Sequence, residues 1–296
     1  MNRAALFLIL IAFGTLWGLT IPLTKVTVSS GHHPFGLIFW QFLLSALVLF
    51  ILIKVRRSRV IIDRSHILFF TVVAFTGTLL PNTSSYFAAF HLPAGVMALV
   101  IALVPMCSLL VALTLRFEKF QWRRLSGVIL GAIAIALLVL PDTSLPDPSK
   151  AIFVLVALIA PMFYGIEGNY LSVKQPADTG PVATLFGASV VGAIVALPLT
   201  LLTGTFVNPI ESGIGASELA LMTTIGLHII AYVGYIWMVD QAGAVFSAQI
   251  AYIVTPAGIV LSMILLGEQP SAFIWIALVI LLVGLFLVQP RQKNRT

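Results

Sequence analysis

The 296-residue sequence predicts an all-α integral membrane protein with ten transmembrane helices in two inverted five-helix repeats around a central cavity. Three observations lead to this fold class: the number of long apolar stretches, the scarcity and placement of charges, and a similarity between the two halves. Charged residues make up 9% of the chain and the mean hydropathy is +1.10, whereas a soluble domain carries about 25% charged residues. A polytopic membrane protein is the class that tolerates this composition.

Each expected helix is an apolar stretch long enough to cross a bilayer, since a ~30 Å hydrocarbon core takes about 20 helical residues. The third and fourth stretches are separated only by His91-Leu92-Pro93, where proline favours a tight break. The ten expected spans are 4–25, 35–53, 67–90, 93–115, 122–140, 151–173, 180–202, 217–240, 244–266 and 271–289.

A linker rich in proline and aspartate, residues 141–150, divides the chain into two halves of five helices. We expect a first repeat over 1–140, an extracytoplasmic linker over 141–150, a second repeat over 151–290 and a basic cytoplasmic tail over 291–296. The apolar run at the N-terminus continues past Pro22 without a convincing cleavage site. It is therefore interpreted as a retained first helix and not as a signal peptide.

The Lys and Arg residues predict the direction of the ten spans. If the N-terminus is cytoplasmic, 14 of the 16 lie in cytoplasmic segments and only Lys25 and Lys150 lie outside. This bias predicts a multi-pass protein of the cytoplasmic membrane with both termini inside and membrane lipid as its surroundings. The net charge of +6 lies at helix ends and forms no basic stripe with aromatics, so nucleic acid is not an expected partner.

The two halves repeat a pattern of proline, glutamate and glycine. Val104-Pro105 corresponds to Thr255-Pro256 at an offset of 151, and Phe117-Glu118 corresponds to Gly267-Glu268 at an offset of 150. Trp17-Gly18 and Tyr164-Gly165 mark the first helix of each half. Because five is an odd number of spans, the second copy crosses the membrane in the inverted direction, as in transporters that alternate access around a midplane site.

These residues resemble the tandem EamA repeats of the drug/metabolite transporter superfamily over essentially the whole chain. The resemblance is most specific at Thr255-Pro256-Ala257 and Leu266-Gly267-Glu268, and it includes Trp17-Gly18 with Lys25 at the end of the helix. It departs from the family at Phe117, where glycine is usual, and at Gln41, where many members carry arginine. The resemblance implies a secondary transporter whose helices 1, 3, 4, 6, 8 and 9 surround a cavity. It also implies peripheral helices 5 and 10, which can form a homodimer contact.

Polar residues inside the third span are the first candidates for the cavity, since polar groups at bilayer depth must face protein or water. Asn82 and Tyr86 lie one helical turn apart, and we expect both to bind substrate. Pro81 is expected to bend the helix. For Ser84 and Ser85, hydrogen bonds within or between helices are an equally good interpretation.

The sixth span contains the acid lying well inside the membrane, Glu167, with Tyr164 three residues earlier on the same face. A carboxylate there could neutralise a substrate amine or carry a proton, and His228 is the second candidate for proton coupling. The alternative is structural: Glu167 lies about 10 Å from the cytoplasmic end, so that it could reach out and pair with Lys174.

Aromatic side chains extend the expected substrate site to three further helices. His228, Tyr232 and Tyr235 form one stripe on the eighth span, and Trp17 lies mid-membrane on the first. Packing within the protein is the ordinary alternative for each of them.

The ninth span adds Gln249 and Tyr252 to the expected substrate-binding residues. They share one helix face with Pro256, which with Pro105 is expected to bend the ninth and fourth helices at matching places. Two pairs with glycine spacing, Gly14 with Gly18 and Gly127 with Gly131, are expected to let helices approach closely.

Sequence motifs for ATP hydrolysis, metal binding and hydrolytic catalysis are missing, so we expect neither a cofactor, a metal nor an enzyme. The expected function is a secondary transporter that moves a small metabolite, such as an amino acid or a related amine-bearing or aromatic solute, by alternating access. No feature decides the direction, and export is slightly favoured. The alternatives are an uptake carrier for a vitamin or quaternary amine and, less favoured, a passive pore.

Overall fold

The structure, a computed structural model, describes residues 3–56, 60–140, 145–208, 213–242 and 248–289. In these ranges the chain forms helices and turns and no strand. Seven spans are single helices: α1 (Arg3–Val28), α2 (Pro34–Arg56), α7 (Trp122–Val139), α10 (Pro181–Leu202), α12 (Ala216–Ala242), α14 (Ala251–Leu266) and α15 (Ala272–Val288).

The other three spans are assembled from consecutive helical pieces. The third consists of α3 (Arg64–Ala74), the π turn η1 (Phe75–Leu79) and α4 (Leu80–His91); the fourth of α5 (Ala94–Ile101) and α6 (Val104–Thr114); the sixth of the 3₁₀ turn η2 (Pro148–Ala151), α8 (Ile152–Ala157) and α9 (Ile159–Lys174). A 3₁₀ turn, η3 (Ala248–Ile250), leads directly into α14.

These elements confirm the predicted fold class. In the described ranges, eight helical spans are long and apolar enough to cross a membrane, and the shorter apolar helices α14 and α15 bring the total to about ten. The predicted span boundaries agree with the observed ones to within a few residues. Residues 141–144 of the expected linker, the start of the expected ninth span and the expected tail lie outside the described residues.

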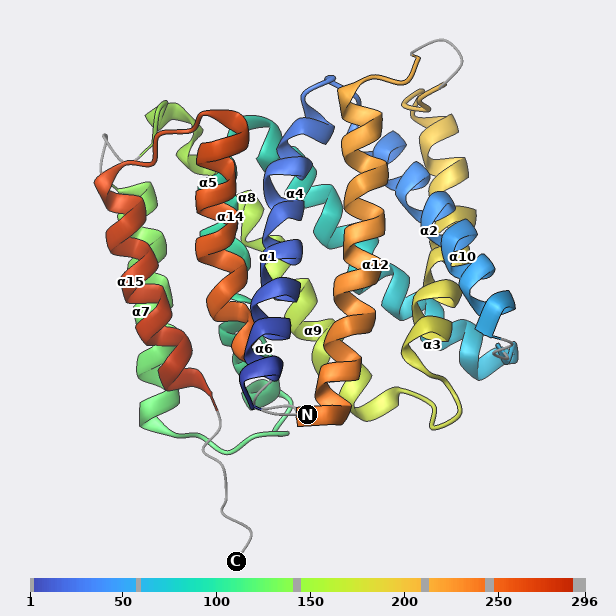
Figure 1. Cartoon of the computed structure of the whole chain (residues 1–296), viewed down its shortest axis with the longest axis horizontal. Helices are drawn as coiled ribbons and strands as arrows, with labels where there is room; N and C mark the ends of the chain where they lie inside the picture. Colours follow the sequence, from blue (N-terminus) through green and yellow to red (C-terminus); the bar gives the residue numbers. More distant parts are fainter. Residues whose placement is uncertain (1–2, 57–59, 141–144, 209–212, 243–247, 290–296) are drawn as a thin grey trace, which may run out of the picture.

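The two halves run through the bundle in opposite directions (Figure 1). α1 begins and α15 ends at the same end of the molecule, which we call the terminal end, whereas η2 and α8 begin at the other end, which we call the opposite end. An inverted second repeat requires this reversal.

Equivalent helices of the two repeats pack against one another at the edges of the bundle. α7 packs along α15 at one edge and α2 packs along α10 at the other, with α1, α12 and α14 between them (Figure 1). Gly127 of α7 approaches the backbone of Gly284, and Gly18 of α1 approaches the backbone of α14 at Val254, so side chains at these glycines would collide with the neighbouring helix. The predicted small-residue faces are therefore helix contacts.

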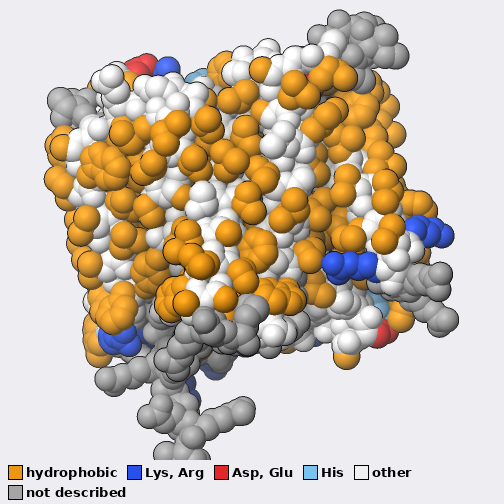
Figure 2. Space-filling model, viewed as in Figure 1, with side chains coloured by type: hydrophobic (Ala, Val, Ile, Leu, Met, Phe, Trp, Pro, Cys, Tyr) orange, Lys and Arg blue, Asp and Glu red, His pale blue; other side chains and the backbone are white. Residues whose placement is uncertain are grey.

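Large apolar side chains cover the outside of this bundle, while charges lie toward its two ends (Figure 2). One of these charges caps the N-terminus of α3: the Asp63 carboxylate accepts a hydrogen bond from the His66 backbone N–H over 2.9 Å. This bond holds the pKa of the Asp63 carboxyl below its usual value, because it favours the charged form.

Candidate functional site

A network of amide and phenol groups joins three spans in the interior of the bundle. Gln41 of α2 accepts hydrogen bonds through Oε1 from Asn82 Nδ2 (2.8 Å) and from the Tyr86 hydroxyl (2.9 Å), both on α4. Tyr164 of α9 donates its hydroxyl hydrogen to Asn82 Oδ1 over 2.8 Å. The structure thus brings together Asn82, Tyr86 and Tyr164, three of the residues expected to bind substrate, and adds a fourth residue, Gln41.

The third span widens just before this network. The Leu80 N–H donates to the Phe75 carbonyl five residues earlier, which closes the π turn η1, and Pro81 lies in the first turn of α4. Proline has no N–H to donate, so the wider turn is a way to continue the helix past Pro81. Within this turn Gly77 lies directly against the Glu167 carboxylate of α9.

Glu167 is half-buried and, among the described residues, has neither a hydrogen-bonding partner nor an ion-pair partner. The carboxylate lies within electrostatic reach of the phenols of both Tyr164 on α9 and Tyr232 on α12. The alternative pairing of Glu167 with Lys174 is not formed in this structure, where Lys174 is exposed. An unpaired carboxylate at this depth can neutralise the charge of a bound cation.

Aromatic rings from α1 and α12 form a second cluster, which includes Tyr232. Trp17 meets His228 edge-to-face at 5.8 Å between ring centroids and meets Tyr235 at 6.2 Å. His228 stacks on Tyr232 at 6.1 Å. All four rings are half-buried. Electron-rich ring faces in such a cluster attract cations and pack on apolar parts of a ligand.

Among the described residues, Gln249 and Tyr252 make no hydrogen bond or ring contact with these two clusters. Gln249 is half-buried in η3, and the Tyr252 hydroxyl is buried without a hydrogen-bonding partner among the described residues, within electrostatic reach of Arg123. The fourth span is interrupted between α5 and α6 just before Pro105, whereas α14 continues without interruption through Pro256. The two proline helices therefore differ in the structure.

The bundle is closed at the opposite end and parted toward the terminal end. At the opposite end α5 packs against both α1 and α14, and α4 packs against α1. Toward the terminal end α6 packs on α9, and the described helices show no comparable packing of α6 on α1 or α14. A pocket of about 390 Å³ opens there, and it is lined by residues of α6, α9, α14 and α15, among them Ser108, Asn169, Ala251 and Leu285.

Sequence reasoning noted Gln41 only as a departure from a family pattern and did not place it in the site. The sequence nevertheless indicated a role for Gln41, because the side-chain amide of a glutamine inside an apolar span must find a hydrogen-bonding partner. Asn169 was also missed: its amide donates to the Ser108 carbonyl (3.0 Å) and hydroxyl (3.1 Å), which ties α9 to α6. Neither partner could be identified without knowing which helices are neighbours.

Comparisons with known proteins match this chain to transporters over nearly its whole length. The profile of the family described as "EamA-like transporter family" matches twice, at residues 3–140 and 151–289. A solved crystal structure superposes with a TM-score of 0.61 at 19% sequence identity, covering 97% of this chain and 96% of the other. That similarity supports the fold.

Three relatives have names that describe transport. An "uncharacterized transporter" of Archaeoglobus fulgidus is 26% identical over 88% of this chain and 89% of its own length. A "probable terminal-alkyne amino-acid exporter" of Streptantibioticus cattleyicolor is 23% identical over 69% of this chain and 67% of its own. The "uncharacterized inner membrane transporter YedA" of Escherichia coli is 23% identical over 67% and 62%, respectively.

Proposed function

Because the chain belongs to the EamA-like transporter family, we propose that it moves a small amine-bearing solute, such as an amino acid, across the cytoplasmic membrane by alternating access. Export is the favoured direction. The observation that carries this proposal is the unpaired carboxylate of Glu167 within electrostatic reach of both an amide–phenol network, through Tyr164, and an aromatic cluster, through Tyr232.

An amine fits this site better than an anion or a purely apolar solute. Keeping an unpaired carboxylate inside a membrane is costly, and a bound ammonium offsets that cost. The rings of Trp17, Tyr232 and Tyr235 add cation–π attraction and apolar surface. Asn82 and Tyr164 supply further polar groups for a carboxylate or amide of the solute. The relative named as an amino-acid exporter agrees with this solute class.

Alternating access accounts for the asymmetric closure of the bundle. At the opposite end α5 of the first repeat packs on α14 of the second, whereas toward the terminal end α6 shows no comparable packing on α1 or α14, so that the site would be reached from the terminal end. Tilting of the inverted repeats would reverse this asymmetry. We place the terminal end in the cytoplasm, because 14 of the 16 Lys and Arg residues belong to segments on that side. This structure would then be the inward-facing state.

The second candidate is an uptake carrier for a quaternary amine or an amine-bearing vitamin. The aromatic cluster favours it, since rings can surround a cation that has no N–H to donate. A passive pore is the weakest alternative, because the described helices are packed closed at the opposite end.

The test is solute counterflow in proteoliposomes with a panel of amino acids, polyamines and choline, repeated with Glu167→Gln. We expect trans-stimulated exchange of at least one amine, and a roughly tenfold or larger rise in its KM in the variant, since removing one partner of a buried charge pair is costly. Lowering the pH should weaken binding to the unmodified protein, because protonation neutralises Glu167, and should affect Glu167→Gln much less.

Glu218→Gln is the matched control, since it removes a carboxylate that is paired with His32 (3.2 Å) at the opposite end. Its KM should stay near that of the unmodified protein. Amine exchange that is unchanged in Glu167→Gln would show that this carboxylate is structural. The absence of trans-stimulation with every solute would refute alternating access for the panel.

A further inference from the structure

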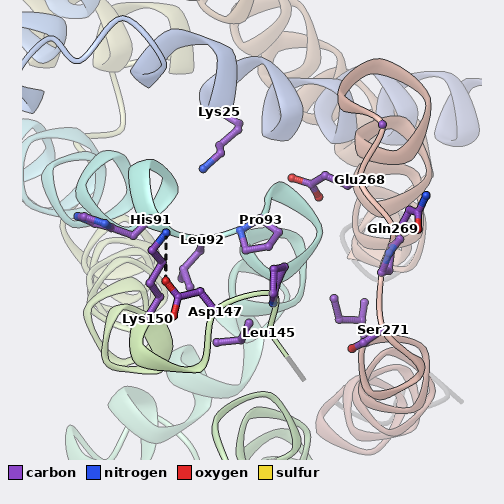
Figure 3. Close-up of a pocket in the computed structure, with 14 residues that line it drawn as sticks. Lys25, His91, Leu92, Pro93, Leu145, Asp147, Lys150, Glu268, Gln269 and Ser271 are labelled. Carbon is purple, nitrogen blue, oxygen red and sulfur yellow. Dashed lines mark ion pairs between the residues drawn. The ribbon is translucent and has the colours of Figure 1, made fainter. Parts of the chain in front are cut away.

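Two charged side chains hold the short link between α4 and α5, residues 92–93, from its two ends (Figure 3). Lys25 of α1 donates from Nζ to the carbonyl oxygens of Ala89 (2.6 Å) and Phe90 (3.1 Å) in the last turn of α4. The Glu268 carboxylate accepts hydrogen bonds from the backbone N–H groups of Ala94 (2.6 Å) and Gly95 (3.0 Å) at the start of α5.

This arrangement is electrostatically complementary at both helix ends. The last carbonyls of a helix carry partial negative charge and the first N–H groups carry partial positive charge, and neither set has a partner within the helix. Lys25 therefore meets the negative end of α4, and Glu268 meets the positive end of α5. Hydrogen bonds to ionised groups are about twice as strong as those between neutral groups, so both contacts hold the link firmly.

Glu268 joins the two repeats where the pathway is closed. It follows α14 in the second repeat and binds α5 in the first, at the end where α5 packs on α1 and α14. Glu118, its counterpart 150 residues earlier, instead pairs with Arg124 (3.0 Å) toward the parted end. One glutamate of the repeated pattern thus connects the repeats across the closed end, and the other forms a pair within the first repeat.

Lys25 and Glu268 can both be hydrated again when they release the backbone groups of α4 and α5. Lys25 and Glu268 line a pocket of about 610 Å³ at the opposite end, together with His91, Asp147 and Lys150 (Figure 3). A charged contact buried in hydrocarbon would be too costly to break in each cycle, whereas one beside a polar pocket can open at moderate cost.

We propose that Glu268 and Lys25 are gating residues, which form a latch that closes the opposite end of the transport pathway in this state and releases it when the repeats tilt. This inference rests on the proposed alternating access. It assigns a role in the transport cycle to two residues that lie outside the substrate site.

The experiment measures water access at the α5–α14 contact with a single cysteine. Cys107 is the only cysteine of the chain, so Cys107→Ser provides the background. Ser262→Cys is a nearly isosteric reporter: Ser262 is fully buried on α14, and its hydroxyl lies 3.6 Å from the position of a side chain on Gly95. A membrane-impermeant maleimide is added to right-side-out vesicles, and Ser149→Cys, exposed at the same end, reports folded and accessible protein.

We expect Glu268→Gln to accelerate labelling of the reporter roughly tenfold, because losing a helix cap shifts a closed–open equilibrium by about that factor. Lys25→Met should act in the same direction, and it serves as the second variant if Glu268→Gln reduces expression. Glu118→Gln is the matched control, and it should not accelerate labelling.

The outcomes separate the latch from the transport mechanism. Measurable reporter labelling that is the same with and without Glu268 and Lys25 would overturn the latch and leave alternating access standing. Equal acceleration by Glu118→Gln would also overturn it, since the effect would then be general loosening. A reporter that stays at background in every variant, while Ser149→Cys labels normally, would mean that this end never opens, which would overturn both proposals.

Discussion

At the scale of single residues, Gln41 is expected to position the substrate groups of α4. One oxygen of its amide accepts from both Asn82 and Tyr86. In Gln41→Met the side chain keeps its length but leaves both donors without this acceptor, at a cost of about 1–3 kcal/mol for an unsatisfied buried group. We expect a several-fold higher KM for the transported amine with little change in maximal rate, measured by counterflow.

The matched control for Gln41→Met is Gln121→Met, which replaces an exposed amide just before α7. It should leave KM and thermal stability unchanged. If Gln41→Met binds the amine as well as the unmodified protein does, the network around Asn82 serves only to pack the helices.

At this scale the sequence predicted which residue types belong to the site but not which ones meet. Asn82, Tyr164 and Glu167 are recognisable alone, because a polar side chain inside an apolar span needs an explanation. Gln41 was missed because its role depends on the contact between α2 and α4, which a single sequence does not reveal. Tyr252 satisfied the same sequence criterion and yet takes no part in this network, since its hydroxyl is buried without a hydrogen-bonding partner among the described residues.

At the scale of the element, the π turn η1 sets the position of the Glu167 carboxylate through Gly77. A side chain at Gly77 would overlap the end of the Glu167 side chain, which is flexible and can move aside. Gly77→Ala should therefore fold, and alanine is the better helix former. We expect a several-fold rise in the KM for the amine in counterflow, since the charge is retained but displaced.

Two further variants decide whether Gly77→Ala acts by displacing the Glu167 carboxylate or by a general effect of alanine in a helix. Gly168→Ala lies on α9 next to Glu167 in sequence, where an added side chain meets nothing, and its KM should not change. Combining Gly77→Ala with Glu167→Asp shortens the acid by one methylene group and should recover part of the affinity. A double variant that is worse than both single ones would contradict the steric explanation.

The elements also show where sequence prediction of the fold succeeds and stops. Apolar length gives the spans to within a few residues, because crossing a bilayer fixes the length of a helix. The internal breaks are harder: the bend expected at Pro81 takes the form of a π turn upstream of it, and the fourth span is interrupted before Pro105 while α14 continues through Pro256. Such details depend on the helices packed around each proline.

At the scale of the whole molecule, the charge distribution predicts how the bundle is oriented. Of the Lys and Arg residues in the described ranges, all but two belong to segments at the terminal end, whereas Lys25 and Lys150 line the pocket at the opposite end. Positive residues are retained on the cytoplasmic side during insertion.

In a Cys107→Ser background, Ser149→Cys should react with an impermeant maleimide on intact cells, and Lys119→Cys should react only after permeabilisation. Both positions are exposed, so accessibility within the protein does not limit either reaction. The reverse pattern would place the termini outside, and the parted end of this structure would then face the exterior. The proposed latch would in that case close the cytoplasmic side, and the direction of transport would have to be argued from an outward-facing state.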